Sequence, residues 1–194
     1  MAASCVFAGI QPIEWLHDLQ DDAGIRLGDE LKRIGYLGDT PVGGRELDSY
    51  FELHIEQDDM MENEDKSVGV VTGGYASHAL TCVFHGECAH TGPTEMKKRH
   101  NAMIGASYFL AAVNDIGWEY EPVGRASASR MIIWPNKFGI LPEFTEVTVD
   151  MRHLDRAKTD EMVAKTRVAL NEAARKGNVN YEITAEWTFG DEVF

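Results

Sequence analysis

The sequence is poor in cysteine, contains no long apolar run and has far fewer basic than acidic residues. The three cysteines, Cys5, Cys82 and Cys88, are odd in number and form no Cys-x-x-Cys pair, so neither a disulfide framework nor a cysteine-built zinc site is indicated. No apolar stretch approaches the roughly 20 residues that a membrane helix needs, and the residues after Met1 do not resemble a signal peptide. These absences predict a cytoplasmic protein without a membrane partner.

The charge balance argues against a nucleic-acid partner. The 194 residues carry 18 Lys plus Arg against 32 Asp plus Glu, a formal net charge of -14. Such a surface would repel the phosphates of nucleic acids, so no nucleic-acid partner is expected. Two explanations remain for the excess of carboxylates: a cation site, or the solvated acidic surface that keeps many globular proteins soluble, which is the commoner case.

The first part of the chain is predicted to form two helices and a strand. Pro12 can begin a helix over 12–21, and a second helix over 27–34 is ended by Gly35. After a loop rich in glycine over 38–45, apolar and polar residues alternate over 50–57, as they do in a strand. Three polar residues would share one face of that strand: Glu52, His54 and Glu56.

The rest of the chain is predicted to form an α/β (α+β) domain. Gly73 and Gly74 tolerate unusual backbone angles and offer a hinge, so we place a domain boundary there. Right-handed crossovers would put two helices, the second ending at Gly177, on one face of a four-stranded antiparallel sheet, the ferredoxin-like arrangement. Apolar periodicity gives the order β-α-β-β-α-β, with strands near 80–84, 129–134, 145–152 and 181–187 and helices near 102–113 and 157–176.

Two histidines are candidates for chemistry. His54 has an imidazole that can bind Zn²⁺, with Glu56 as a supporting group on the same strand face; the alternative is a half-buried histidine bonded to a neighbour. His90 follows a strand in a loop of small residues and turn formers. There it can bond a carbonyl oxygen or stabilise an oxyanion, or it can simply be exposed to solvent.

Arg152 is the third candidate. It follows Asp150 at the end of a predicted strand, and its planar guanidinium suits a substrate carboxylate better than any other side chain. The alternative is a structural ion pair with Asp150 or Asp155. The other histidines show no convergent ligand spacing, and the sequence contains no phosphate loop or nucleophile elbow.

Together these segments resemble one enzyme family over nearly the whole chain. Residues 52–57, Glu-Leu-His-Ile-Glu-Gln, match the E-L-H-I-E-Q segment of the amidohydrolase family that contains N-carbamoyl-L-amino-acid hydrolases, allantoate amidohydrolases and β-ureidopropionases, a branch of the two-zinc exopeptidase superfamily. The run over 86–96 is similar to the family's G-E-A-A-H-A-G-T-T-P-M, and Arg99 falls where the next helix carries R-x-D-A. Residues 140–142 and 149–153 are similar to its N-V-I-P and L-D-L-R-H.

The resemblance implies roles for five residues. His54 would be a zinc ligand, and His90 would be the catalytic residue that reaches the scissile amide from a lid domain and contacts the substrate. Arg152 would clamp the substrate carboxylate, and Gln57 would also contact the substrate. Gly139 occupies another substrate-binding position, where the family usually has an asparagine, so substrate affinity or specificity is expected to differ.

The resemblance also implies a domain plan. Residues 1–73 would be part of a zinc-hydrolase catalytic domain, residues 74–190 a dimerisation or lid domain, and residues 191–194 the start of a return to the catalytic domain. The family's His-x-Asp ligands, its Glu-Glu pair and its final histidine ligand have no counterpart in this sequence. We therefore expect the chain alone to be inactive and to hold neither of the two divalent ions (zinc, or manganese, cobalt or nickel) stably.

Complete members of the family are expected to hydrolyse the carbamoyl (ureido) C–N bond of N-carbamoyl-L-amino acids or related ureido acids. The expected partners are therefore a small ureido or carbamoyl amino acid and a second copy of the lid domain. An alternative is a stand-alone dimerisation or lid module without catalysis, which pairs with a second copy through the edge strand of its sheet and the adjoining helices. A third is a ligand-binding regulator that inherited the fold.

Overall fold

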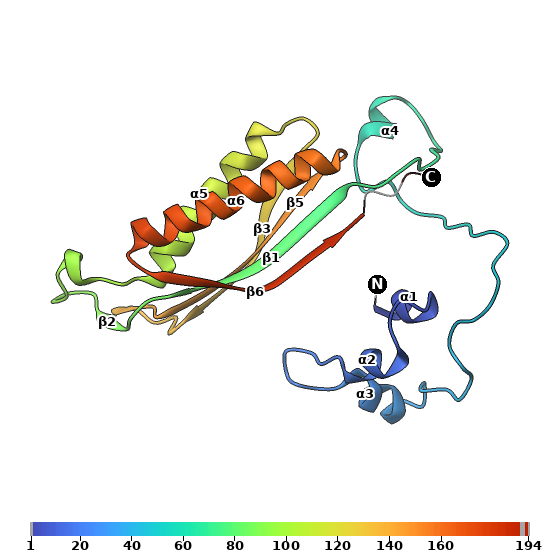
Figure 1. The fold of residues 1–194 in the computed structure, drawn as a ribbon, viewed down its shortest axis with the longest axis horizontal. Helices are drawn as coiled ribbons and strands as arrows, with labels where there is room; N and C mark the ends of the chain where they lie inside the picture. Colours follow the sequence, from blue (N-terminus) through green and yellow to red (C-terminus); the bar gives the residue numbers. More distant parts are fainter. Residues whose placement is uncertain (1, 191–192, 194) are drawn as a thin grey trace. The chain divides into compact units, whose positions relative to one another are not determined.

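The computed structural model describes residues 2–190 and Val193, which divide between two compact units, Met1–Glu64 and Asp65–Phe194 (Figure 1). None of the helices in the described part of the chain is long and apolar enough to cross a membrane. The predicted boundary between a catalytic segment over 1–73 and a lid domain over 74–190 stays a prediction. Of the predicted return segment over 191–194, all but Val193 lies outside the described residues.

The first unit contains four short helices and a long irregular segment. The helices are α1 (Ala2–Phe7), α2 (Ile13–Asp18), α3 (Leu27–Arg33) and α4 (Met60–Asn63), and the irregular segment lies between α3 and α4. The two helices predicted from the sequence are present as α2 and α3. In the described part of this unit, only two hydrophobic residues, Val6 and Leu16, are buried.

The strand predicted over 50–57 is not formed. Residues 51–56 have no regular secondary structure, and Phe51, Leu53 and Ile55 are 92%, 104% and 76% exposed. A strand needs a neighbouring strand to bond its N–H and C=O groups, and the described residues provide no such neighbour for this segment. The alternation of apolar and polar residues is therefore not sufficient to form a strand here.

The second unit is built on a four-stranded antiparallel sheet. Its strands are β1 (Ala76–His85), β3 (Arg125–Trp134), β5 (Phe144–His153) and β6 (Asn180–Phe189). They lie in the order β3-β5-β1-β6, so β1 and β5 are central and β3 and β6 form the two edges. Each strand has 10 residues. A strand of that length spans about 30 Å.

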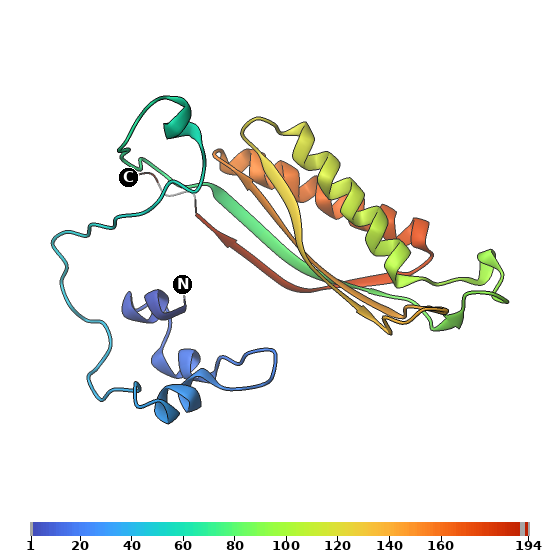
Figure 2. The ribbon, with the colours of Figure 1, turned by 180° about the vertical axis from the view of Figure 1, so that it is seen from behind.

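Two long helices, α5 (Ala102–Glu119) and α6 (Arg156–Gly177), cover one face of this sheet, as the views from both sides show (Figure 2). The predicted four-stranded antiparallel sheet with two helices on one face is confirmed. Burial of each large apolar side chain between the two layers contributes roughly 1.5–3 kcal/mol. The fully buried members of this core include Leu80, Cys82, Phe84, Phe109, Val113, Val147, Val149, Met151, Met162 and Leu170.

Two glycines allow α5 and α6 to approach closely. A Cβ added at Gly177 would lie 2.7 Å from Gly105 Cα and 2.8 Å from Gly105 N, which are backbone atoms. The helix does end at Gly177, but the left-handed residue at its C-terminus is Asn178, with φ 53°. Gly177 is therefore required by the packing of the helices rather than by its backbone conformation.

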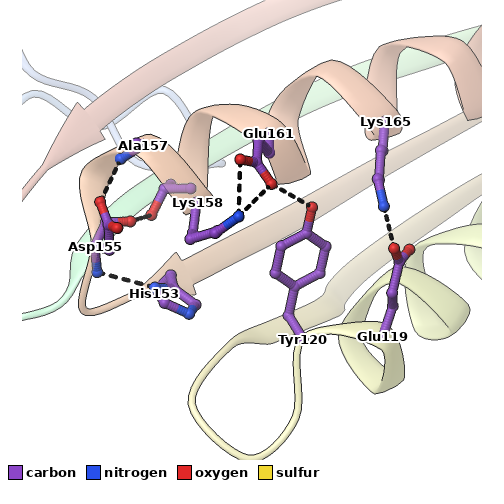
Figure 3. A network of polar contacts seen from close by, with 9 residues as sticks. Glu119, Tyr120, His153, Asp155, Ala157, Lys158, Glu161 and Lys165 are labelled. Carbon is purple, nitrogen blue, oxygen red and sulfur yellow. Dashed lines mark hydrogen bonds and ion pairs between the residues drawn. The ribbon is translucent and has the colours of Figure 1, made fainter.

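A polar network connects the end of α5 to the first turns of α6 (Figure 3). Tyr120 Oη donates to Glu161 Oε2 at 3.3 Å, and Lys165 forms an ion pair with Glu119. Asp155 caps α6 by accepting a hydrogen bond from the first turn of the helix at 2.8 Å. Exposed ion pairs contribute at most about 1 kcal/mol each, so the buried core rather than this network holds the helices on the sheet.

Candidate functional site

His54 lies on the irregular segment of the first unit. Its side chain is exposed, and its Nδ1 lies 2.5 Å from the carbonyl oxygen of the next residue, Ile55. Glu56, the predicted supporting group, instead accepts a hydrogen bond from the Met61 backbone N–H at 3.1 Å, and Glu52 bonds the hydroxyl of Tyr50. The local arrangement therefore keeps the imidazole accessible but provides no carboxylate partner for it among the described residues.

A zinc role for His54 requires further ligands. Among the described residues, no three His, Cys, Asp or Glu side chains lie together as a metal site would require. Gln57, the predicted substrate contact at the end of the same segment, is exposed and has a positive φ of 61°, an uncommon conformation for a residue other than glycine.

His90 is the second residue of the short strand β2 (Ala89–His90), which pairs with β4 (Ile140–Leu141). The side chain is exposed, and its Nδ1 accepts a hydrogen bond from the Gly92 backbone N–H at 3.0 Å. A neutral imidazole whose Nδ1 accepts a hydrogen bond carries its proton on Nε2. His90 therefore presents an N–H donor, which is the group needed to stabilise a developing oxyanion.

Gly139 lies beside His90. The residue that follows it, Ile140, pairs with His90 across the two short strands, and the Thr91 N–H donates to the Gly139 carbonyl oxygen at 3.0 Å. The φ of Gly139 is 87°, and a Cβ added there would have no heavy atom within 4 Å. The structure thus brings together two of the positions that the sequence assigns to substrate binding.

We expect the Gly139→Asn variant to fold and to place a carboxamide next to His90. Apart from glycine, asparagine enters the left-handed region most readily, so the free energy of unfolding should fall by about 1 kcal/mol or less. The β-branched control Gly139→Val should lose about 2 kcal/mol. Urea titration of the three proteins measures both values. Equal losses for Asn and Val would show that the backbone conformation does not determine the residue at this position.

Arg152 lies on β5 and forms an ion pair with Asp150 of the same strand. Its Nε and Nη2 donate to the two carboxylate oxygens of Asp150 at 2.6 and 3.2 Å, and the guanidinium carbon lies 5.9 Å from the centre of the Phe189 ring. The hydrogen bond that Arg152 donates to Asp150 raises the pKa of Arg152. Asp155, the other partner considered, caps α6 instead. The Arg152 side chain remains 47% exposed, so donors are still available to a ligand.

The structure does not bring His90 and Arg152 together. Arg152 lies near the C-terminal end of β5, whereas β2 and β4 lie beyond the opposite end of the sheet (Figure 1). The intervening 10-residue strand corresponds to about 30 Å. Because this distance exceeds the length of an amino-acid derivative, one such molecule cannot contact both side chains of the same protomer.

Phe189 is a neighbour of Arg152 that the sequence analysis missed. Phe189 belongs to β6, and it approaches Arg152 because both residues lie opposite Ser77 of β1. Only the register of three strands could have predicted this contact, since no local motif connects the two positions. The contact places an aromatic ring against the guanidinium, which restricts its orientation.

Comparison with known proteins finds similar sequences and similar solved structures, although no family model matches the chain. It is 38% identical over 194 residues to an N-carbamoyl-L-amino-acid amidohydrolase of Rhizobium meliloti, covering all of this chain and 47% of that protein. An allantoate amidohydrolase of Bacillus subtilis is 26% identical over 136 residues, which cover 69% of this chain and 33% of the relative. The crystal structure of an amidase of the hydantoinase/carbamoylase family from Burkholderia vietnamiensis superimposes with a TM-score of 0.89 at 39% identity, over 97% of this chain and 46% of that one.

The similarity to the Rhizobium meliloti protein extends over the whole chain, whereas the chain spans about half the length of the curated relatives it matches. These relatives are amidohydrolases named for carbamoyl amino acids or for allantoate. By sequence and by fold, the chain is thus homologous to one part of the N-carbamoyl-L-amino-acid amidohydrolase and allantoate amidohydrolase family.

Proposed function

We propose that this chain supplies the lid half of an amidohydrolase that cleaves the carbamoyl (ureido) C–N bond of N-carbamoyl-L-amino acids or related ureido acids. The observation that carries the proposal is the exposed His90, whose bonded Nδ1 leaves an N–H donor on Nε2. Homology to an N-carbamoyl-L-amino-acid amidohydrolase along the whole chain supports the reaction class.

In this reaction the side chains of the chain bind and polarise the substrate. Arg152 would hold the substrate carboxylate through the guanidinium donors that Asp150 does not use. His90 would donate from Nε2 to the oxygen of the carbamoyl group as negative charge develops on it. His54 would contribute one ligand to the divalent-metal pair expected in the complete family enzyme, which supplies the activated water. The other ligands would come from outside the described residues.

The outer surfaces of the two helices suggest where a second copy binds. The exposed side of α6 is charged, with Lys158, Glu161, Lys165, Arg167, Arg175 and Lys176. The exposed residues of α5 include four large apolar side chains, Met103, Ile104, Tyr108 and Trp118, which are between 36% and 71% exposed. The same helix packs over β3, an edge strand with unpaired backbone groups. We therefore propose a homodimer through β3 and α5.

This pairing would unite the two ends of the candidate site. In an antiparallel contact between two copies of β3, the end of the strand at Arg125 lies beside the end at Trp134 of the second copy. Arg125 pairs with Arg152 within the sheet, whereas Trp134 is at the end where β2 and β4 lie. Arg152 of one copy and His90 of the other would then face the same substrate.

The experiment that tests the proposed function compares this chain with a chimera in which it replaces the matching segment of the Rhizobium meliloti amidohydrolase. We expect the purified chain to form dimers but to release no ammonia from N-carbamoyl-L-amino acids and to contain less than one metal ion per chain. The chimera should bind metal and hydrolyse the substrate, and its His90→Ala variant should be slower by about 100-fold.

Two outcomes would contradict the proposal. Turnover by the chain alone, with stoichiometric metal, would mean that it holds a complete site. A chimera that folds and binds metal but hydrolyses no carbamoyl or ureido substrate would favour the alternative, a dimerisation or lid module without a part in catalysis.

A further inference from the structure

The turn that follows His90 is held by one arginine. Arg99 donates from Nη2 to the carbonyl oxygens of Thr91 and Thr94 at 2.6 and 2.9 Å, and from Nε to the Thr94 oxygen at 3.1 Å. A guanidinium presents its donors in a rigid planar fork, so these three bonds restrict both the distance and the orientation of the two carbonyl groups. The residues over 91–94 are thereby fixed relative to Arg99.

Arg99 is itself anchored to the main sheet and to a helix. Asn178, the C-cap of α6, donates from Nδ2 to the Arg99 carbonyl oxygen at 3.2 Å. The next residue, His100, accepts a hydrogen bond on its carbonyl oxygen from the Glu87 N–H at 2.7 Å, directly beyond the end of β1. The segment that carries Arg99 therefore connects the end of α6 to the end of β1, and both ends belong to the folded core.

The same turn also forms a hydrogen bond with the imidazole of His90. The Gly92 N–H, which bonds His90 Nδ1, lies between the two residues whose carbonyl groups Arg99 binds. We propose that Arg99 is a positioning residue for His90, because its fork holds the Gly92 N–H on Nδ1 and so keeps the proton of the imidazole on Nε2, directed away from the turn. This assignment rests on the proposed function of His90 and adds a residue that acts through it.

Replacement of Arg99 by lysine tests this assignment in the chain as it exists. Lysine keeps the positive charge but is a single point donor, so it cannot bridge two carbonyl groups with the same geometry. We expect hydrogen exchange at the Gly92 amide to become about tenfold faster in Arg99→Lys, because the turn opens more often. Long-range ¹⁵N NMR of the imidazole should show His90 as the Nε2–H tautomer in the wild type and a mixture of tautomers in Arg99→Lys.

The matched control is Lys98→Ala. Lys98 is the adjacent cation, but its Nζ bonds Glu95 at 2.7 Å and makes no contact with the carbonyl groups of the turn. This variant should leave both the exchange of the Gly92 amide and the tautomer of His90 unchanged. Exchange at core amides of β1 reports whether any variant has lost its fold, and Arg99→Lys is expected to retain it.

Either of two results would overturn the assignment. Exchange at Gly92 and a His90 tautomer that are equal in Arg99→Lys and in the wild type would show that Arg99 does not hold the turn against His90. A loss of protection as large in Lys98→Ala would show that the turn opens on any substitution in this segment and not through the loss of the Arg99 fork. Both measurements are independent of turnover, so failure of the proposed function in the chimera would not change them.

Discussion

A mixture of two inactive chimeras, one carrying His90→Ala and the other Arg152→Gln, should recover about a quarter of the unmodified chimera's turnover. The recovery follows from the distance between the two residues. They lie at opposite ends of a 10-residue strand pair, so a site that uses both must take them from different copies. In the mixed dimer, one site combines the intact Arg152 of the first variant with the intact His90 of the second.

The size of the recovery follows from the number of sites. Random exchange of subunits makes about half of the dimers mixed, and each mixed dimer has one intact site of two, which gives about one quarter of full activity. The subunits are exchanged by mild denaturation and refolding, and ammonia release is measured before and after mixing. Each variant alone should remain slower than the unmodified chimera by about 100-fold.

The control is a mixture of the His90→Ala chimera with a chimera that carries both substitutions. No dimer in that mixture has an intact site, so no activity should return. If the His90→Ala and Arg152→Gln chimeras exchange subunits but recover nothing, the two residues serve the same protomer; an Arg152→Gln chimera that is fully active by itself would show that Arg152 does not take part. Either result would contradict the two-copy arrangement, in which each site takes Arg152 from one copy and His90 from the other. The fold of the second unit would not be affected.

A large effect on stability is expected from Gly177→Ala. The added methyl group would meet Gly105 Cα and N at 2.7 and 2.8 Å, and these backbone atoms of α5 cannot move aside as a flexible side chain would. The helices would have to separate over a core that is fully buried. We expect the free energy of unfolding to fall by about 3 kcal/mol, at the upper end of the range for overpacked cores.

Denaturant unfolding followed by circular dichroism measures this loss. Gly74→Ala is the control, because a Cβ at Gly74 would meet no heavy atom within 4 Å and the residue has no positive φ. Its stability should change by less than about 0.5 kcal/mol. A similarly small change for Gly177→Ala would mean that α5 and α6 can separate without loss, and that helix termination alone explains this glycine.

The second unit could be predicted from the sequence because its strands and helices each bury one periodic face. Val147, Val149 and Met151 alternate in β5, and all three are fully buried against the helices. The segment over 50–57 has an equally regular alternation, yet it forms no strand, because a strand depends on a neighbour that a local pattern does not specify.

The sequence motifs predicted which residues belong to the candidate site, but not how far apart these residues lie. His90 follows the first strand of the sheet and Arg152 ends the antiparallel strand beside it, so the predicted topology already placed them at opposite ends. Motifs identify each side chain separately and contain no information on that separation. The contacts of Arg99 with Thr91 and Thr94 were also hidden, since they depend on the shape of a turn rather than on residue type.

Under the proposed function, the length of the central strands limits how the substrate can change during evolution. Insertion of one residue into a strand reverses the faces of every side chain beyond it, which would expose the core of β5 and bury its polar residues. Under the two-copy arrangement, the proposed span between Arg152 of one copy and His90 of the other is therefore fixed by the fold. Adaptation to a longer or shorter substrate would have to come from the loops at the far end, where position 139 has open space for any side chain its backbone accepts.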